Sequence, residues 1–309
     1  MNIIFMGTPN FAVPTLEALF AQGYTIDLVV TQKDRPKGRG KKVLYTPVKE
    51  KALELGLEVY QPDSINSPES VDFLRKLSPD FMVVVAYGQI LKENVLEIPK
   101  YGCYNVHASL LPKYRGAAPI NWAIIDGESM TGVTIMEMEE GLDTGDIILK
   151  ESIPIENEDD SLSIHDKLSE LGANLIISAL EKISKGDYSK VPQNHLESTY
   201  AAKLNKDLGK IDWNKSTIEI VNLIRGLKPW PSAYFIYNEE IVKVHKGKAI
   251  SSNLKGKIGE IIKVNSEGIF VCAHDGIVVM EEIQFPGKRK MIVEEYLRGN
   301  SIKEGIVLV

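Results

Sequence analysis

Two polar side chains that could act together on a carbonyl group lie near the middle of the chain. Asn105 and His107 stand two residues apart in the stretch 103–107, whose other residues predict a buried strand. In a strand this spacing places both side chains on one face, about 7 Å apart along the chain. An amide and an imidazole that titrates near neutral pH can both donate to an oxygen that gains negative charge. The pair indicates acyl transfer, and the alternative is a structural histidine at a strand end.

A third residue, Asp143, lies between Gly141 and Gly145 in the loop that follows a predicted strand over 131–137. If that strand neighbours the strand 103–107, the carboxylate can reach the imidazole and favour its charged form. The alternative is an aspartate that stabilises a turn beside glycine. Ser109 is not flanked by a Gly-x-Ser-x-Gly elbow. We therefore expect direct attack by the nucleophile of a substrate, without a covalent enzyme intermediate.

The elements that must position these residues are those of a doubly wound α/β domain with a mostly parallel sheet. A strand over 3–6, a helix over 11–21 and a strand over 25–31 form the first βαβ unit. The turn after the first strand holds one glycine, so the dinucleotide fingerprint is incomplete and we expect no NAD. The carboxyl ends of such strands, where 87–91 and 105–109 begin their loops, are the expected ligand site.

The remaining chain predicts a second domain. Periodicity fades between 188 and 206, which we interpret as a linker after a catalytic domain over 1–187. Over 207–309, five short alternating segments separated by turn residues predict a small β-barrel of OB-like type.

Composition narrows the class of protein and the compartment in which it is expected. The 309 residues are 44% hydrophobic and 25% charged, as in ordinary globular proteins. No signal peptide or membrane span is expected, and two cysteines give neither a disulfide framework nor a metal site. We therefore expect a reduced cytoplasmic protein without metal. The net charge is −6, yet residues 206–309 carry 16 Lys and Arg against 13 Asp and Glu, which points weakly to a nucleic-acid partner.

A basic segment follows the second predicted strand. Its glycines and proline favour an irregular loop, and it has one acid among six basic residues, which are Lys33, Arg35, Lys37, Arg39, Lys41 and Lys42. Such a loop can neutralise phosphates along a nucleic-acid backbone. An ordinary solvated surface loop is the equal alternative.

The motifs together resemble the folate-dependent formyltransferases. Asn105-x-His107 is followed by Ser-Leu-Leu-Pro-x-x-Arg-Gly-x-x-Pro, and Asp143 lies in Gly-x-Asp-Thr-Gly-Asp. The resemblance extends along the whole chain, through Met6-Gly-Thr-Pro, Arg35-Pro-Lys-Gly-Arg-Gly-Lys, Ile211-Asp-Trp, Ile224-Arg-Gly and Pro229-Trp-Pro. Within the family it is most similar to the branch whose acceptor is a charged initiator tRNA.

The resemblance implies a Rossmann-like catalytic domain and a monomer that takes a formyl group from 10-formyltetrahydrofolate. The acceptor would be the α-amino group of methionyl-initiator tRNA. Asn105, His107 and Asp143 would be catalytic, and the basic segment would contact the tRNA, as would the second domain. The folate would lie against Tyr87, Gly88, Gln89, Ile90, Leu91, Ser109, Leu110, Leu111, Pro112 and Met138.

Three other functions remain open at this level. A related enzyme that formylates an amino-sugar nucleotide would share the three catalytic residues but would not need the basic segment. A tRNA-binding factor without catalysis would not need the three residues. A hydrolase of formylfolate would use water in place of the amine and would leave the basic second domain unexplained.

Overall fold

The computed structural model describes residues 1–37, 42–251 and 256–308, and they form two compact units. The first unit comprises Met1–Pro119, Met130–Ile153 and His165–Ala201. The second comprises Ile120–Ser129, Pro154–Ile164 and Ala202–Val309. Each unit is therefore assembled from three separate stretches of chain.

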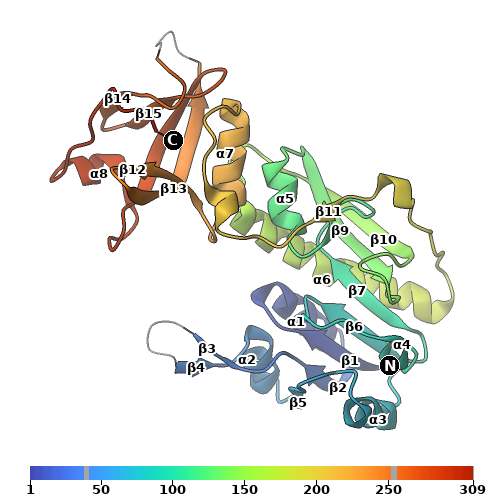
Figure 1. The fold of residues 1–309 in the computed structure, drawn as a ribbon. Helices are drawn as coiled ribbons and strands as arrows, with labels where there is room; N and C mark the ends of the chain where they lie inside the picture. The colour runs from blue at the N-terminus through green and yellow to red at the C-terminus, as the bar shows by residue number, and fades with distance from the viewer. Residues whose placement is uncertain (38–41, 252–255, 309) are drawn as a thin grey trace. The chain divides into compact units, whose positions relative to one another are not determined.

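The first unit is built on a seven-stranded sheet (Figure 1). Five strands pair in parallel, and β9 runs antiparallel to β7. Most of these strands are rich in β-branched residues and buried on both faces, as expected for strands at the centre of an α/β sheet. In spatial order they are β10 (Ile147–Pro154), β9 (Met130–Glu137), β7 (Cys103–His107), β6 (Phe81–Val85), β1 (Asn2–Gly7), β2 (Thr25–Val30) and β5 (Val59–Tyr60).

Local sequence signals set the helices of this unit. Thr46 caps α2 by accepting a hydrogen bond from the Lys49 amide (3.2 Å), and Pro47 takes the first helical position. Ser67 and Pro68 do the same for α3. The helical segments are η1 (Asn10–Ala12), α1 (Val13–Ala21), α2 (Pro47–Glu54), α3 (Pro68–Leu77), α4 (Glu93–Leu96), η2 (His195–Glu197) and α6 (Ser161–Lys185), whose first four residues belong to the second unit.

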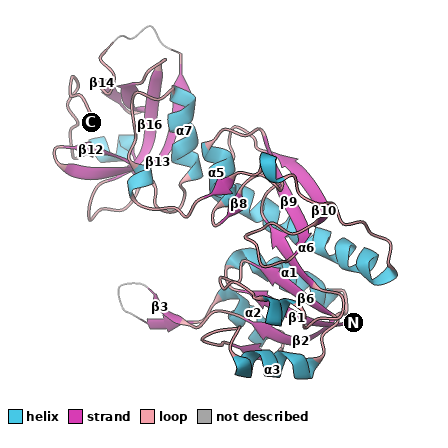
Figure 2. Ribbon diagram, turned by 45° about the vertical axis from the view of Figure 1, so that its right-hand side comes forward, coloured by secondary structure: helices cyan, strands magenta, loops and turns pink. Residues whose placement is uncertain are grey.

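The basic segment is more ordered at its two ends than its glycines and proline predict. β3 (Arg35–Lys37) and β4 (Lys42–Leu44) pair antiparallel and form a hairpin that stands away from the main sheet (Figure 2). Main-chain pairing between the two ends therefore corrects the expectation of an irregular loop at these positions. The residues between the strands, 38–41, lie outside the described part of the chain.

The second unit contains an antiparallel sheet, as predicted. Its alternating apolar residues enclose a core around Trp213, Phe235 and Val278. Helix α7 begins with a capping box in which Ser216 and Glu219 satisfy each other's backbone amides. The sheet order is β12 (Ala233–Tyr237), β13 (Glu240–Ile250), β16 (Ile277–Gln284), β15 (Gly268–Cys272) and β14 (Ile261–Asn265), with β17 (Met291–Ile292) on β16. The helical segments are α5 (Pro119–Ile125), whose first residue belongs to the first unit, η3 (Asp207–Gly209), α7 (Thr217–Gly226) and α8 (Val293–Leu297).

The stretch 188–206, expected as a linker, carries defined structure. Val191 bridges Ile147, and β11 (Tyr200–Ala201) pairs in parallel with β8 (Arg115–Gly116). These short pairings attach 191–201 to the first unit, beside the loop that follows β7.

Candidate active site

Strand β7 presents Asn105 and His107 on one face of the sheet. Both side chains are buried, with 9% and 6% of their surface exposed. Val106 points to the opposite face, where it packs beside Gly172 of α6, since a Cβ on Gly172 would lie 2.6 Å from a Val106 methyl carbon. Helix α6 thus covers one face of β7, and the other face holds the two polar groups.

The imidazole of His107 lies between two hydrogen-bond acceptors. Nε2 is 3.0 Å from the carbonyl oxygen of Tyr114, and Nδ1 is 3.7 Å from Oδ2 of Asp143. The Tyr114 carbonyl oxygen can only accept, so Nε2–H donates to it, and only a protonated ring carries a proton on Nδ1 as well. The 3.7 Å separation is too long for a hydrogen bond. The Nδ1 proton of that form is therefore free to donate to a substrate oxygen.

Asp143 reaches His107 because its loop folds back along β7. β9 is antiparallel, so its last residue, Glu137, pairs with Tyr104 at the start of β7. The loop then returns until Oδ2 of Asp143 accepts a hydrogen bond from the Gly116 amide at 2.8 Å. Asp143 has a φ of +52°, in the left-handed region that costs an L residue free energy. The loop geometry is therefore imposed by its surroundings.

The amide of Asn105 completes the arrangement. Within the part of the chain that the structure describes, this buried side chain makes no hydrogen bond to a protein group. The amide is therefore available to a ligand. Its N–H groups and the Nδ1–H of His107 are donors on one face of β7. Such a pair of donors suits an oxygen that becomes negatively charged during attack on a carbonyl.

The three segments expected to hold a folate converge in space. Tyr87 and Leu91, after β6, belong to one buried apolar cluster, and Leu111 belongs to another with Met136 and Ile147. Met138 packs against both clusters. The stretches 87–91, 109–112 and 138 are thus neighbours at the sheet edge next to β7.

Not every residue of this group exposes a side chain to a ligand. Leu91 and Leu111 are buried in the clusters, and Ser109 donates to the Lys113 carbonyl at 2.7 Å. Gln89 is held by its own loop, because Oε1 accepts from the Ile65 amide at 2.9 Å. Ile90 is 75% exposed. Leu110 and Pro112 are half-buried, the peptide bond before Pro112 is cis, and Gly88 has a φ of +92°. These positions can therefore contact a ligand mainly through backbone groups.

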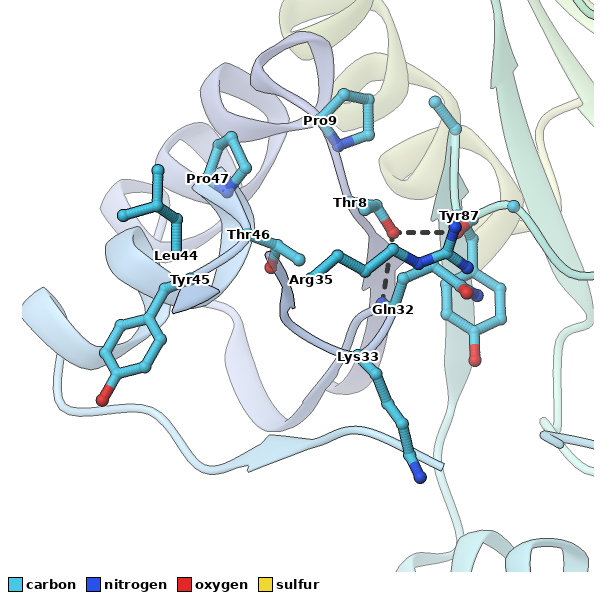
Figure 3. Close-up of a pocket in the computed structure, with 12 residues that line it drawn as sticks. Thr8, Pro9, Gln32, Lys33, Arg35, Leu44, Tyr45, Thr46, Pro47 and Tyr87 are labelled. Carbon is cyan, nitrogen blue, oxygen red and sulfur yellow. Dashed lines mark hydrogen bonds between the residues drawn. The ribbon is translucent and has the colours of Figure 1, made fainter. Parts of the chain in front are cut away.

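A pocket of about 430 Å³ opens where β1, β2 and β6 end (Figure 3). The Thr8 hydroxyl donates to the Tyr87 carbonyl oxygen at 2.8 Å and accepts from the Gln32 amide at 3.3 Å. The Arg35 side chain extends across the pocket toward Tyr87. Burial raises the pKa of Tyr87 far above its ordinary value, so its hydroxyl stays protonated. Other residues that line the pocket include Pro9, Lys33, Leu44, Tyr45, Thr46 and Pro47.

The predicted tRNA-binding residues divide into three groups. Lys33 and Arg35 line this pocket and are exposed. Lys37 and Lys42 lie in β3 and β4, and the structure describes only their backbone. Arg39 and Lys41 lie outside the described residues.

One residue to which the sequence assigned no role, Gln193, contacts the Asp143 loop, and Arg115 contacts Gln193. Gln193 donates to the carbonyl oxygens of Asp143 and Gly145, at 2.9 and 2.7 Å, and accepts from the buried Arg115. Arg115 belongs to the motif quoted above, whereas Gln193 lies in the expected linker without a local signal.

Two features are absent from the described residues. Apart from the gaps at 38–41, 252–255 and 309, no group of three His, Cys, Asp or Glu side chains is placed to hold a metal ion. No helix in the same ranges is long and apolar enough to cross a membrane.

Comparison with known proteins finds matches along nearly the whole chain. Residues 1–180 match the model of the formyl transferase family, and 203–301 match the model of its C-terminal domain. A protein of Clostridioides difficile named methionyl-tRNA formyltransferase is 51% identical over 308 residues, covering 100% of both chains. One of the same name from Alkaliphilus metalliredigens is 52% identical, covering 100% of this chain and 98% of the other.

Among solved structures, the sugar 3N-formyl transferase WlaRD, determined in the presence of dTDP and 5-N-formyl-THF, is similar in fold. Its TM-score is 0.68 at 21% identity, and the match covers 94% of this chain and 99% of the other. The family models, the near relatives and the shared fold agree: the chain belongs to the formyl transferase family.

Proposed function

We propose that the protein transfers the formyl group of 10-formyltetrahydrofolate to the α-amino group of methionyl-initiator tRNA. One observation carries the proposal. Asn105, His107 and Asp143 meet on one face of β7, with 3.7 Å between His107 and Asp143, in a chain that matches methionyl-tRNA formyltransferases over its whole length. The activity belongs to translation initiation, so the proposal also places the protein in the cytoplasm. We further propose that it acts as a monomer.

The three side chains divide the chemistry between them. Asn105 Nδ2–H and His107 Nδ1–H donate to the formyl oxygen as the methionyl amine attacks the formyl carbon. Asp143 stabilises the imidazolium and takes up the proton of the amine through water. The bond between the formyl carbon and the folate nitrogen then breaks, that nitrogen receives the proton, and tetrahydrofolate leaves. The carbonyl of Tyr114, at 3.0 Å from Nε2, holds the ring in the orientation that presents Nδ1. No nucleophilic side chain is required, because the substrate amine attacks directly.

The folate donor supplies the formyl group, and it would lie at the sheet edge beside β7. The unpartnered amide of Asn105 and the convergence of 87–91, 109–112 and Met138 support this placement. Backbone groups of 87–91 would hold the pterin, because the side chains of Gln89 and Leu91 are already engaged.

The acceptor end of the tRNA would enter from the side of the β3–β4 hairpin. Lys33 and Arg35 at the pocket give positive charge beside the site, and the basic segment continues through Lys37, Arg39, Lys41 and Lys42. A polyanion of the size of tRNA also accounts for the net positive charge of residues 206–309. The second unit would contact the tRNA farther from the amino acid.

The test is transfer of a labelled formyl group by the purified protein. With 10-formyltetrahydrofolate and methionyl-initiator tRNA, label should appear in formylmethionyl-tRNA, and uncharged tRNA should serve as the control. An amino-sugar nucleotide, offered in parallel, should accept none. Transfer to the sugar alone would replace the proposal with the activity named for the structural neighbour. Release of free formate without an acceptor would identify a hydrolase.

A further inference from the structure

Both polar atoms of the Gln193 side chain form hydrogen bonds within the first unit. It is 6% exposed. Its Nε2 donates to the carbonyl oxygens of Asp143 at 2.9 Å and Gly145 at 2.7 Å. Its Oε1 accepts from Arg115 Nε at 3.1 Å and Nη2 at 2.6 Å. One amide thus joins the loop that carries Asp143 to the strand β8 that follows the β7 loop.

Arg115 fixes which way this amide points. The guanidinium is 1% exposed, and in the described part of the chain its side-chain partners are Gln193 and the Nδ1 atom of His195, at 3.3 Å. A buried cation without a carboxylate needs oxygen or nitrogen acceptors around it. The oxygen of Gln193 therefore faces Arg115, and the two N–H groups must face the Asp143 loop.

The loop needs such support because its backbone is unfavourable. Asp143 has a φ of +52°. Gly145 runs so close to β9 that an added Cβ would lie 1.8 Å from the Glu137 carbonyl oxygen. The Gly116 amide holds the carboxylate of Asp143, and Gln193 holds the main chain on both sides of Thr144. Loss of the main-chain bonds would let the carboxylate move away from His107.

We propose that Gln193 is a positioning residue for formyl transfer, which holds the Asp143 loop so that the carboxylate faces His107 Nδ1. The inference rests on the proposed function. Gln193 touches no reacting atom and acts only through Asp143. Arg115 assists Gln193, because the guanidinium orients the amide.

The experiment replaces Gln193 by glutamate. Gln193→Glu keeps the size of the side chain and its bonds from Arg115, but it cannot donate to the two carbonyl oxygens. We expect kcat to fall about 10- to 100-fold, as for two lost hydrogen bonds at a charged site. The KM values for folate and methionyl-tRNA should change less than about threefold, because no binding group is removed. The matched control is Asn194→Asp, the same change one residue along at an exposed position, which should keep wild-type kcat.

A second measurement separates positioning from general stability. In an Asp143→Asn background the Gln193→Glu change should cost less than about threefold, because its effect passes through the Asp143 carboxylate. Gln193→Asn, which shortens the amide by one methylene without adding charge, should lower kcat in the same way and serves if the glutamate variant does not fold. A wild-type kcat in either variant, or equal losses in both backgrounds, overturns the inference. Failure of the wild-type protein to formylate methionyl-tRNA would instead overturn the proposed function.

Discussion

At the scale of single residues, the site depends on what each nitrogen of His107 faces. The Tyr114 carbonyl occupies Nε2, and the Asp143 carboxylate lies 3.7 Å from Nδ1. The Tyr114 carbonyl therefore orients the ring, and Nδ1 lies on the same face of β7 as Asn105. Asn105 has no protein partner within the described ranges. These two donors form the core of the proposed mechanism.

Replacement of His107 by alanine should lower kcat by about two to four orders of magnitude, the scale of a lost oxyanion donor. The free energy of unfolding should fall less than for a large apolar side chain, because the Tyr114 carbonyl regains water. Formyl transfer to methionyl-tRNA under saturating substrates measures the effect. His274→Ala, at an exposed position of the second unit, provides the control. Near-wild-type turnover of the His107 variant would remove this residue from the mechanism.

The sequence was sufficient to name these residues but not to place all of them relative to one another. Asn105 and His107 share a face because of the period of two along a strand, and this follows from spacing alone. Asp143 lies close to His107 because β9 pairs antiparallel with β7 and the loop after β9 runs back along β7. Tertiary packing sets this arrangement. Gln193 carried no signal, since its partners are main-chain atoms 48 and 50 residues away and a buried arginine 78 residues away.

At the scale of elements, the β3–β4 hairpin is the most informative departure from expectation. Glycine and proline predicted an irregular basic loop, and the structure pairs Arg35–Lys37 with Lys42–Leu44. The pairing brings the two basic ends together beside the pocket that Lys33 and Arg35 line. Sequence propensity does not reveal it, because a three-residue ladder depends on cross-strand contacts more than on composition.

Replacing Lys33 and Arg35 by glutamine should weaken tRNA binding. The slope of log K against the logarithm of the salt concentration should become shallower by about 0.9 for each phosphate that the protein no longer neutralises. The affinity for folate should change less than the affinity for tRNA, because the tRNA contact depends on neutralised phosphates. Lys33 also pairs with exposed Asp63, but an exposed pair of this kind contributes little stability. Binding titrations over a range of salt concentrations provide the measurement.

The matched control removes the same charge elsewhere in the first unit. Arg75→Gln with Lys76→Gln alters two exposed basic residues of α3. Loss of binding in this pair as well would show a general effect of net charge and return the hairpin to an ordinary surface feature.

At the scale of the whole molecule, the chain does not divide at a single linker. The second unit includes 120–129 and 154–164, which lie in sequence within the catalytic part. In that unit Arg225 donates to the carbonyls of Glu156 and Asp159, and Lys228 bonds to Asp160 at 2.9 Å. The sequence indicated two domains from composition and periodicity, but contacts between distant segments are invisible to both.

Asp160 joins two of those segments and shows a predictable dependence on pH. It caps α6 by accepting from the amides of Leu162 and Ser163, and it pairs with Lys228. Burial alone would raise the pKa of Asp160, but the hydrogen bonds from Lys228 and the two amides outweigh it and lower the pKa below 3.8. The carboxylate therefore stabilises the folded state above its ordinary pKa, and this contribution is lost as the pH falls through the lowered value.

Asp160→Ala, which removes cap and charge, should lower the free energy of unfolding by about 1–2 kcal/mol at pH 7. Asp160→Asn keeps a capping oxygen and should cost less than about 1 kcal/mol, the size of a partly exposed ion pair. Tryptophan fluorescence during urea unfolding is the measurement, because all three tryptophans, 122, 213 and 230, belong to the second unit. The difference between wild type and Asp160→Asn should shrink between pH 4 and pH 3, whereas Asp126→Asn, at an exposed position of the same unit, should show none at either pH. A difference that stays constant down to pH 3 would mean that the Asp160 charge does not hold these segments together.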